Sequence, residues 1–529
     1  MDGVQETIGK RKSPALLIAL LTVVVLIGAG SVSAFFLLNK SPKVKYLLAE
    51  TKTFAQIGDL FEERYKNEVD WMDVQKTKPV ETSFDLSAEW NDPSASYDMV
   101  ELQRIVNNTT LSMKQVKDPV EKEWEINFSG AFGSISSDFV TFYITPERFM
   151  AALPFTDKLL YFMDEDYGKL MRETDSFYEG PDKLGLSHLF EEQFAMTGEF
   201  QTYVKEEYME YLYHELPEEA FTSEKEEIDL FGEKINTEKV EMNLSEEQVK
   251  TLLVNLFKKA RTDEKLKALL KEQIAFSTMT DDISARQLTE MIRDFEDSLD
   301  EAIDGIESLH IPDGIKSTIW HKSNSIVKRE FTMSMGEFEE SIATFTFEGV
   351  QLLEKSGQKW DYSFTGMDPH SGEDAVLNFK GDLTWKDGKS DDTITISAED
   401  TVITYKGKEE LDGKERTFNR EFSVSDDDFS PRLVWSGKAT HEKDSMKSDN
   451  DFTIIDPSGA ISSSDIYLRL KKEGKIVKKV EMPSESEKLV DVGNMSSREL
   501  DDLGNELAEE FEKWVTELMG DLQRELENF

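Results

Sequence analysis

Hydrophobic side chains follow two different periods along this 529-residue chain, and an uncharged run precedes both. Residues 13–39 carry no charged side chain, and their apolar stretch, Ala15 to Leu38, would span about 36 Å as a helix against a bilayer core of about 30 Å. We expect a transmembrane anchor at 13–39 behind a short cytosolic tail at 1–12. The alternative is a cleaved signal peptide, because Val32-Ser33-Ala34 is an acceptable cleavage pattern.

Beyond the anchor, the first period is helical. Leu47, Phe54, Ile57 and Phe61 recur at helical spacing, which predicts a juxtamembrane helix within 43–78 that stands the body off the bilayer. Strict alternation follows, for example in the segment from Phe84 to Trp90, where apolar and polar residues take turns. This pattern predicts a first antiparallel β region over 79–182, with one buried and one wet face.

The period returns to helical over 183–310. A capping box, Ser245 with Gln248, opens one helix, and a long apolar stripe from Leu288 to Ile306 marks another. The segment is rich in aromatic residues, which we interpret either as ordinary core or as part of a binding surface: Phe190, Phe194, Tyr203, Tyr208 and Tyr211. This part of the chain is therefore predicted to be mainly helical, apart from a short hairpin near Ile228 to Leu244.

Alternation resumes over 311–483 and predicts a second antiparallel β region, with Trp360, Tyr362 and Phe364 on one face of a strand. Asp387-Gly388 and Asp412-Gly413 are strong hairpin signals, and we interpret Lys472 to Lys475 as a third turn. The expected fold class is α+β: a large antiparallel meander, in one or more sheets, packed with amphipathic helices and preceded by one transmembrane helix.

A final amphipathic helix is predicted at 496–529, where Ser496 and Glu499 form the cap. Its apolar stripe either packs on the body or docks a partner. Acidic residues outnumber basic ones on its other faces, which argues against a helix that lies on lipid. The stripe consists of Leu500, Leu503, Leu507, Phe511, Trp514, Leu518, Leu522 and Leu526.

Charge and cysteine content limit which cell compartment and which classes of partner fit this chain. The net charge is −46, and the tail at 1–12 carries a net +1, so the acidity lies beyond the anchor. Such a field repels nucleic acid, which we exclude as a partner. The chain has no cysteine, as expected for a protein that avoids stray thiol oxidation outside the cytoplasm. We predict a single-pass protein of the cell membrane of a bacterium, with its large C-terminal region outside; Asn-x-Ser/Thr sequons leave a luminal eukaryotic glycoprotein as the alternative.

A search for chemistry predicts no catalytic, cofactor-binding or metal-ligating residue. His214-Glu215 lacks the second histidine that a helical zinc site needs, and no phosphate-binding glycine loop or nucleophile elbow is present. The acidic runs Asp164 to Asp166 and Asp426 to Asp428 lack calcium-loop spacing, so we interpret them as solvated loops. Paired carboxylates across a groove stay open as an alternative, because any two of the 107 acidic residues would suffice.

The order of elements and the predicted export resemble, at low resolution, the bacterial lipoprotein-carrier type of fold, in which a curved sheet wraps around helices. The whole chain also resembles uncharacterised single-pass, cysteine-free extracytoplasmic proteins of Gram-positive bacteria. Neither resemblance transfers a site residue. The hypothesis is a membrane-tethered envelope protein with a non-enzymatic binding or scaffold role, whose partner is a protein or an apolar ligand. The alternative is an extracytoplasmic hydrolase that acts on wall polymer or peptide.

Overall fold

One large sheet organises the described part of the chain. The computed structural model describes residues 41–92, 96–178, 182–190, 198–277, 285–367, 374–425, 430–455, 466–484 and 488–528. Within these ranges, twenty strands form a single sheet packed with helices, which confirms the α+β class and the antiparallel meander. The predicted anchor at 13–39 and the tail at 1–12 lie outside the described residues. Among the described ranges, no helix combines the length and the apolar character that a bilayer crossing requires.

Strand order in the sheet follows from the pairings. Beginning at the edge strand β7, each strand pairs antiparallel with the next in the chain as far as β19. β19 then pairs with β1, and the meander continues from β1 to β6, where the short β20 adds in parallel. The two β regions predicted from the sequence therefore belong to one sheet, joined at β1 and β19.

The strands of the first β region are β1 Val80–Trp90, β2 Thr109–Asp118, β3 Glu123–Phe132, β4 Ile135–Ile144, β5 Arg148–Ala152 and β6 Lys158–Met163. The others are β7 Phe221–Leu230, β8 Glu233–Leu244, β9 Ile315–Lys322, β10 Ser325–Met335, β11 Ala343–Glu354, β12 Gly357–Met367, β13 Asp374–Thr384, β14 Lys389–Ala398, β15 Thr401–Asp412, β16 Glu415–Ser425, β17 Arg432–His441, β18 Ser445–Ile455, β19 Ile466–Ile476 and β20 Lys488–Asp491.

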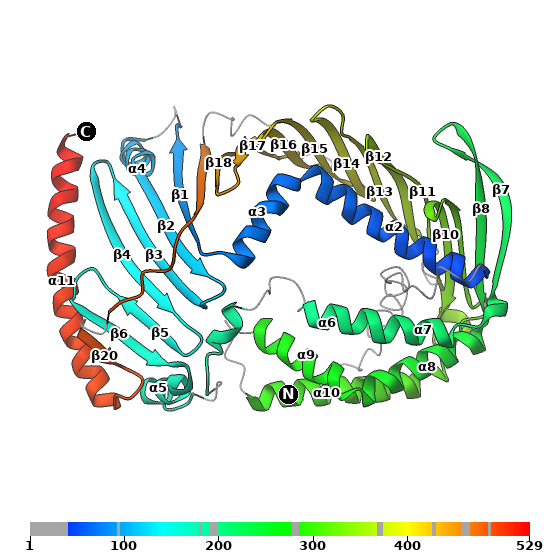
Figure 1. Ribbon diagram of the computed structural model, residues 1–529, viewed down its shortest axis with the longest axis horizontal. Helices are drawn as coiled ribbons and strands as arrows, with labels where there is room; N and C mark the ends of the chain where they lie inside the picture. Colours follow the sequence, from blue (N-terminus) through cyan, green and yellow to red (C-terminus); the bar gives the residue numbers. More distant parts are fainter. Residues whose placement is uncertain are drawn as a thin grey trace, which may run out of the picture.

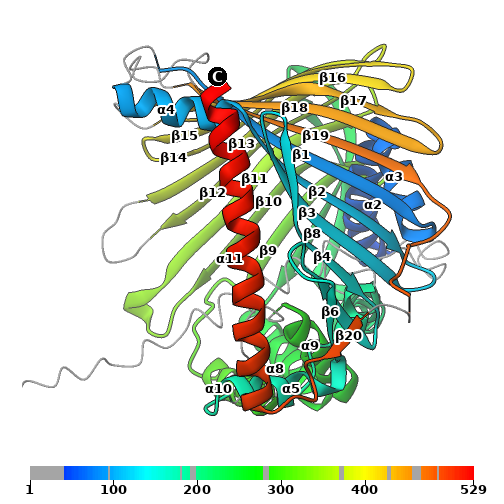
Figure 2. The same ribbon diagram turned by 90° about the vertical axis from the view of Figure 1, so that its left-hand side faces the viewer.

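The sheet curves into an arch, and the helices lie on both of its sides (Figure 1). α2 and α3 lie inside the arch, α6 to α10 cover the inner side of the end that carries β7 to β10, and α11 runs along the outer side past β4 (Figures 1 and 2). The helices are α2 Pro42–Arg64, α3 Lys66–Thr77, α4 Tyr97–Asn107, α5 Tyr167–Thr174, α6 Gly198–Tyr203, α7 Met209–Glu215, α8 Glu246–Thr262, α9 Glu264–Ser277, α10 Ala285–Ile306 and α11 Ser497–Asn528.

The main core lies between the inner face of β7 to β10 and the helices. Val240 and Ile319 are fully buried on neighbouring strands, and Leu212 and Leu253 meet them from α7 and α8. The predicted capping box that begins α8 is confirmed, because the Ser245 hydroxyl and the Gln248 side chain each accept the other's backbone N–H. This end of the molecule therefore has an ordinary helix-on-sheet core.

The juxtamembrane segment does not stand off as a stalk. It forms α2 and α3, which meet at Tyr65 and lie against the inner face of the sheet. Val44, Leu47 and Ala49 on α2 are buried in the main core, and Trp71 on α3 packs on Val80. The regularly spaced apolar residues of this segment are thus buried, in part, against the sheet.

Two predicted turns are confirmed and one is wrong. Asp387-Gly388 links β13 to β14 with positive φ at both residues, as a tight hairpin requires, and Asp412-Gly413 links β15 to β16. Lys472 to Lys475 lies instead inside β19. A Cβ on Gly474 would come within 2.8 Å of the Trp71 indole. Gly474 therefore leaves room for Trp71 of α3. The turn was predicted because a glycine between charged residues is typical of a turn.

The predicted stripe at the C-terminus lies on α11, which begins at the expected cap: the Ser496 backbone N–H and hydroxyl both donate to Glu499. Phe155 contacts Phe511 and Trp514, and Lys158 forms an ion pair with Glu506. Phe511 nevertheless stays 46% exposed, and no described stripe residue is fully buried. Leu526 has no described side chain. The docking role of the stripe stays a prediction.

A buried ion network fastens α2 and α3 to the sheet. Glu409 on β15 is 4% exposed, and its carboxylate lies 2.9 Å from the Arg416 Nη1 and 2.6 Å from the Arg420 Nη2. Arg416, 2% exposed, also donates to the α3 residue Glu68 at 2.7 Å and to the backbone oxygen of Arg64 at the end of α2 at 2.6 Å. These bonds join the helices to β15 and β16.

The pKa values of the two buried acids of this network shift in opposite directions. Burial opposes ionisation of Glu409, but the positive charges of Arg420, Arg64 and Arg416 outweigh it and hold its pKa below the usual range. Burial raises the pKa of Asp392 above its ordinary value, although the carboxylate is paired with Arg64. Glu409 is therefore the anion on which the surrounding arginines depend.

Replacing Glu409 by Gln is expected to lower the free energy of unfolding by about 3–5 kcal/mol, because the buried arginines lose their central counter-charge. Glu410→Gln is the matched control: Glu410 is the next residue of the same strand and pairs with Lys389 on the exposed face, so about 1 kcal/mol or less is expected. Denaturant unfolding of the full-length chain in detergent measures both. Equal effects of the two changes would show that the network does not hold the helices.

Candidate ligand-binding cavity

Apolar and aromatic side chains gather on the inner face of the sheet. Directly opposite residues of antiparallel strands share a face, so the pairs Gly349 with Tyr362 and Tyr362 with Phe379 place these side chains together. Neighbouring rings are in contact: the centroids of Phe347 and Tyr362 are 5.1 Å apart, and those of Trp360 and Phe379 are 5.4 Å apart. Strands β11 to β13 thus present a floor of aromatic rings to α2.

A cavity of about 630 Å³ lies between this floor and α2. From α2, Phe54 and Phe61 line it while remaining 62% and 59% exposed, so their rings border open space and not packed protein. We call this the covered cavity. Its lining is Glu50, Thr53, Phe54, Ile57, Leu60, Phe61, Arg64, Tyr65, Arg329, Phe347, Gln351, Leu353, Gln358, Trp360, Tyr362, Phe379, Leu383, Asp392, Ile394 and Tyr405.

A glycine makes part of the floor possible. A Cβ on Gly381 would lie 2.1 Å from the Trp360 ring, so the indole rests directly on the β13 backbone. Gly349 serves Tyr362 in the same way, with 2.3 Å to the phenol ring. The glycines let these rings lie flat on the sheet, which leaves the space between them and α2 free.

The charges at the covered cavity are paired. Arg329 Nη2 lies 2.5 Å from Glu50 Oε2, and this contact outweighs the cost of burial and keeps the pKa of Arg329 above its usual range. Arg64 pairs with Asp392. Burial raises the pKa of Tyr362 to about 12 and that of Tyr405 to about 12, so both phenols are neutral hydrogen-bonding groups. The cavity therefore offers an apolar interior with no excess charge.

Two buried donors on residues that line the covered cavity have no hydrogen-bond partner among the described residues. They are the Arg64 Nε and the Trp360 Nε1. An unpaired buried donor costs about 1–3 kcal/mol. Both atoms are shielded from solvent, so a ligand in the cavity would reach them only if the side chains moved.

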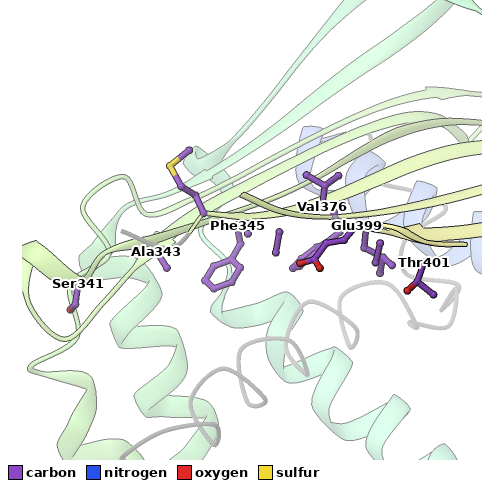
Figure 3. Close-up of a pocket in the computed structure, with 12 residues that line it drawn as sticks. Ser341, Ala343, Phe345, Val376, Glu399 and Thr401 are labelled. Carbon is purple, nitrogen blue, oxygen red and sulfur yellow. The ribbon is translucent and has the colours of Figure 1, made fainter. Parts of the chain in front are cut away.

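A second cavity lies on the inner face of the sheet beside the covered cavity. A cavity of about 860 Å³, which we call the open cavity, is lined by strands β11 to β15, the same strands that form the floor of the covered cavity. Phe345 and Thr401 point from the sheet toward the side where the helices lie, whereas Val376 points the other way (Figure 3). On β13, Leu377 lines the open cavity and Phe379, two residues on, lines the covered one. The two cavities are neighbours on one face.

The structure separates the residues that the sequence singled out. Trp360 and Tyr362 line the covered cavity, and Phe364 lines the open one. Tyr208 and Phe190 instead lie in packed clusters, and Phe194 is outside the described residues.

Asp164 accepts hydrogen bonds from the backbone N–H groups of Gly185 and Leu186; Asp426 to Asp428 are not described. Among the described residues, no three His, Asp or Glu side chains are grouped as a metal site. The contribution of Ile57 and Phe61 was missed, because their helical spacing fits a packed helix equally well.

Comparisons with known proteins give distant likenesses only. No family model and no curated protein matches the chain. The solved structure of Salmonella typhi OmpF in complex with daunomycin covers 76% of this chain and 98% of its own at 8% identity, with a TM-score of 0.19. OmpT, an outer membrane protein of Vibrio cholerae folded in vitro, covers 75% and 96% at 7% identity, with a TM-score of 0.16. At such TM-scores, the likenesses carry no argument about this chain.

Gly381→Ala is expected to lower the free energy of unfolding by about 1–3 kcal/mol, because the new methyl group forces the Trp360 indole off the sheet. The control is Gly366→Ala on the same face, where a Cβ would meet Phe345 at an ordinary 3.8 Å. Denaturant unfolding followed by tryptophan fluorescence measures both variants. An alanine at 381 that is tolerated as well as one at 366 would contradict the close contact.

Proposed function

We propose that this protein is a membrane-tethered envelope protein that binds an apolar ligand in the covered cavity and does no chemistry on it. The covered cavity is the observation that carries the proposal. Its volume of about 630 Å³ is within the range of about 300–1,000 Å³ that is common for ligand pockets. Its aromatic lining and its paired charges are those of a site that binds an apolar body.

The tether in this proposal rests on sequence. The uncharged run 13–39 ends two residues before Ser41, whose hydroxyl caps α2, so the anchor would lead directly into the helix that covers the cavity. Absence of cysteine supports an external position. A ligand drawn from the bilayer would then have a short path to the site.

Binding is favoured over hydrolysis by the state of the carboxylates. Paired-carboxylate hydrolysis needs one acid that donates a proton and another that acts as base or nucleophile. The two carboxylates that line the covered cavity, those of Glu50 and Asp392, are instead each paired with an arginine. Neither is free for the acid or the base role.

The proposal predicts a bound apolar molecule on the full-length protein. Native mass spectrometry of the chain released from membranes is expected to show an adduct of the same mass in two detergents of different mass. Ile57→Glu places a charge in the cavity and should reduce that adduct at least tenfold, while folding is retained because the Ile57 side chain is 49% exposed.

Ala55→Glu is the matched control, because Ala55 is exposed on the same helix and does not line the covered cavity. It should leave the adduct unchanged. Wild-type protein that carries only detergent, or equal losses in both variants, would refute an apolar ligand at this site.

A further inference from the structure

The apolar surface of the inner face continues far beyond the covered cavity. One row of side chains crosses the sheet from β12 to β19 and onward to β1, β2 and β3, and all of its members share the inner face by register. The exposed apolar members of this row, such as Phe364 at 36% and Ile454 at 54%, are more than a third exposed. We call this row the open strip; its representatives are Phe364, Leu377, Ile403, Leu433, Leu468 and Leu111.

The open strip is continuous with the covered cavity. On β15, Ile403 belongs to the strip, and Tyr405, two residues on and on the same face, lines the covered cavity. Glu409 of the ion network lies six residues from Ile403, roughly 20 Å along the strand. The same strand thus carries strip, cavity and network in that order.

The strip is electrically neutral. The charged side chains that the register places on the inner face, such as Arg329, Asp392 and Arg416, lie in the half of the strands next to α2 and α3. Strand positions of the strip itself carry none among the described residues, although Glu399, in the turn between β14 and β15, lines the open cavity beside Leu377. A protein partner would have to meet a chain of net charge −46 with no charged group at the contact to guide it. A hydrocarbon chain needs no such guidance.

The strip is also long. From β12 to β3 it crosses eleven adjacent strands, which at about 4.8 Å per strand is roughly 50 Å. That exceeds the roughly 30 Å hydrocarbon core of a bilayer, which two acyl chains fill end to end. The strip is therefore longer than one acyl chain and long enough for several placed along it.

We infer that the open strip holds the acyl chains of several membrane lipids laid along the inner face and connected to the covered cavity. This rests on the proposed function for its entry site, since the covered cavity lies on the helix that follows the predicted anchor. The neutral strip accepts chain after chain without regard to the headgroup, which would project past the rim into solvent. The protein would then hold several lipids in a row along the strip, which we call a file of lipids, and not a single buried ligand.

The test is photo-crosslinking of the full-length chain in vesicles of phosphatidylglycerol and phosphatidylethanolamine with deuterated acyl chains. A benzophenone side chain is placed at Ile403 or Leu433 in the strip, at Phe379 in the covered cavity, and at Thr404 as the outer-face neighbour of Ile403. Deuterated adducts, read by mass spectrometry of digested protein, are expected at 403, 433 and 379, at least tenfold above those at 404.

A charge in the strip gives a second measurement. Ile403→Glu should lower the lipid adduct at Leu433 at least tenfold, and Thr404→Glu should not. Adducts at Phe379 without adducts at 403 and 433 would overturn the file of lipids and leave the proposed function standing. Adducts at none of the three would overturn both. Cross-links from the strip to residues 13–39 or to another protein chain would show a protein occupant and overturn the inference.

Discussion

The buried network around Glu409 is the constraint on which the rest of the structure depends. Charges enclosed in a protein are tolerated only when they are paired and hydrogen-bonded, so Arg416 and Arg420 on the sheet require Glu409, and Arg416 also reaches Glu68 and the backbone of Arg64. These directional bonds fix where α2 and α3 lie, because a purely apolar contact would allow the helices to slide. The two helices are thereby held over one half of the strands, and in the described part of the chain neither of them covers the other half.

That placement explains why the molecule has cavities. A sheet of this width presents more apolar surface on its inner face than the described helices can cover, and a well-packed protein leaves few voids of its own. At β7 to β10, helices α7 and α8 fill the space, and Val240 and Ile319 are completely buried. Farther along, α2 faces β11 to β15, and its Phe54 and Phe61 side chains stay largely exposed. The cavity and the core are both built from strands with alternating apolar and polar residues. They differ only in which helices lie opposite the apolar face of those strands.

Sequence pattern predicted the elements better than their assembly. Alternation of Trp360, Tyr362 and Phe364 indicated a strand with one apolar face, and Asp387-Gly388 indicated its neighbouring hairpin, because both signals are local. No local signal shows that β1 pairs with β19, since that register joins segments far apart in the chain. Gly474 was misread as part of a turn for the same reason: it is a glycine because of Trp71, a residue of a distant helix. The covered cavity depends on such long-range placements, so only its aromatic floor was foreseeable.

An apolar row that is exposed on a folded protein is ordinarily a liability, because surfaces of this kind associate with one another. Two features of this chain oppose that outcome. The strip lies on the inner side of an arch, where a second sheet cannot approach closely, and the net charge of −46 makes two copies repel each other. The edge strand β7 carries consecutive charged residues, including Glu224, Lys225 and Glu226, which discourage pairing with another sheet. The repulsion acts on folded acidic proteins at a distance but has no effect on an uncharged hydrocarbon tail. The acidity therefore favours a small apolar occupant of the proposed strip over a second protein.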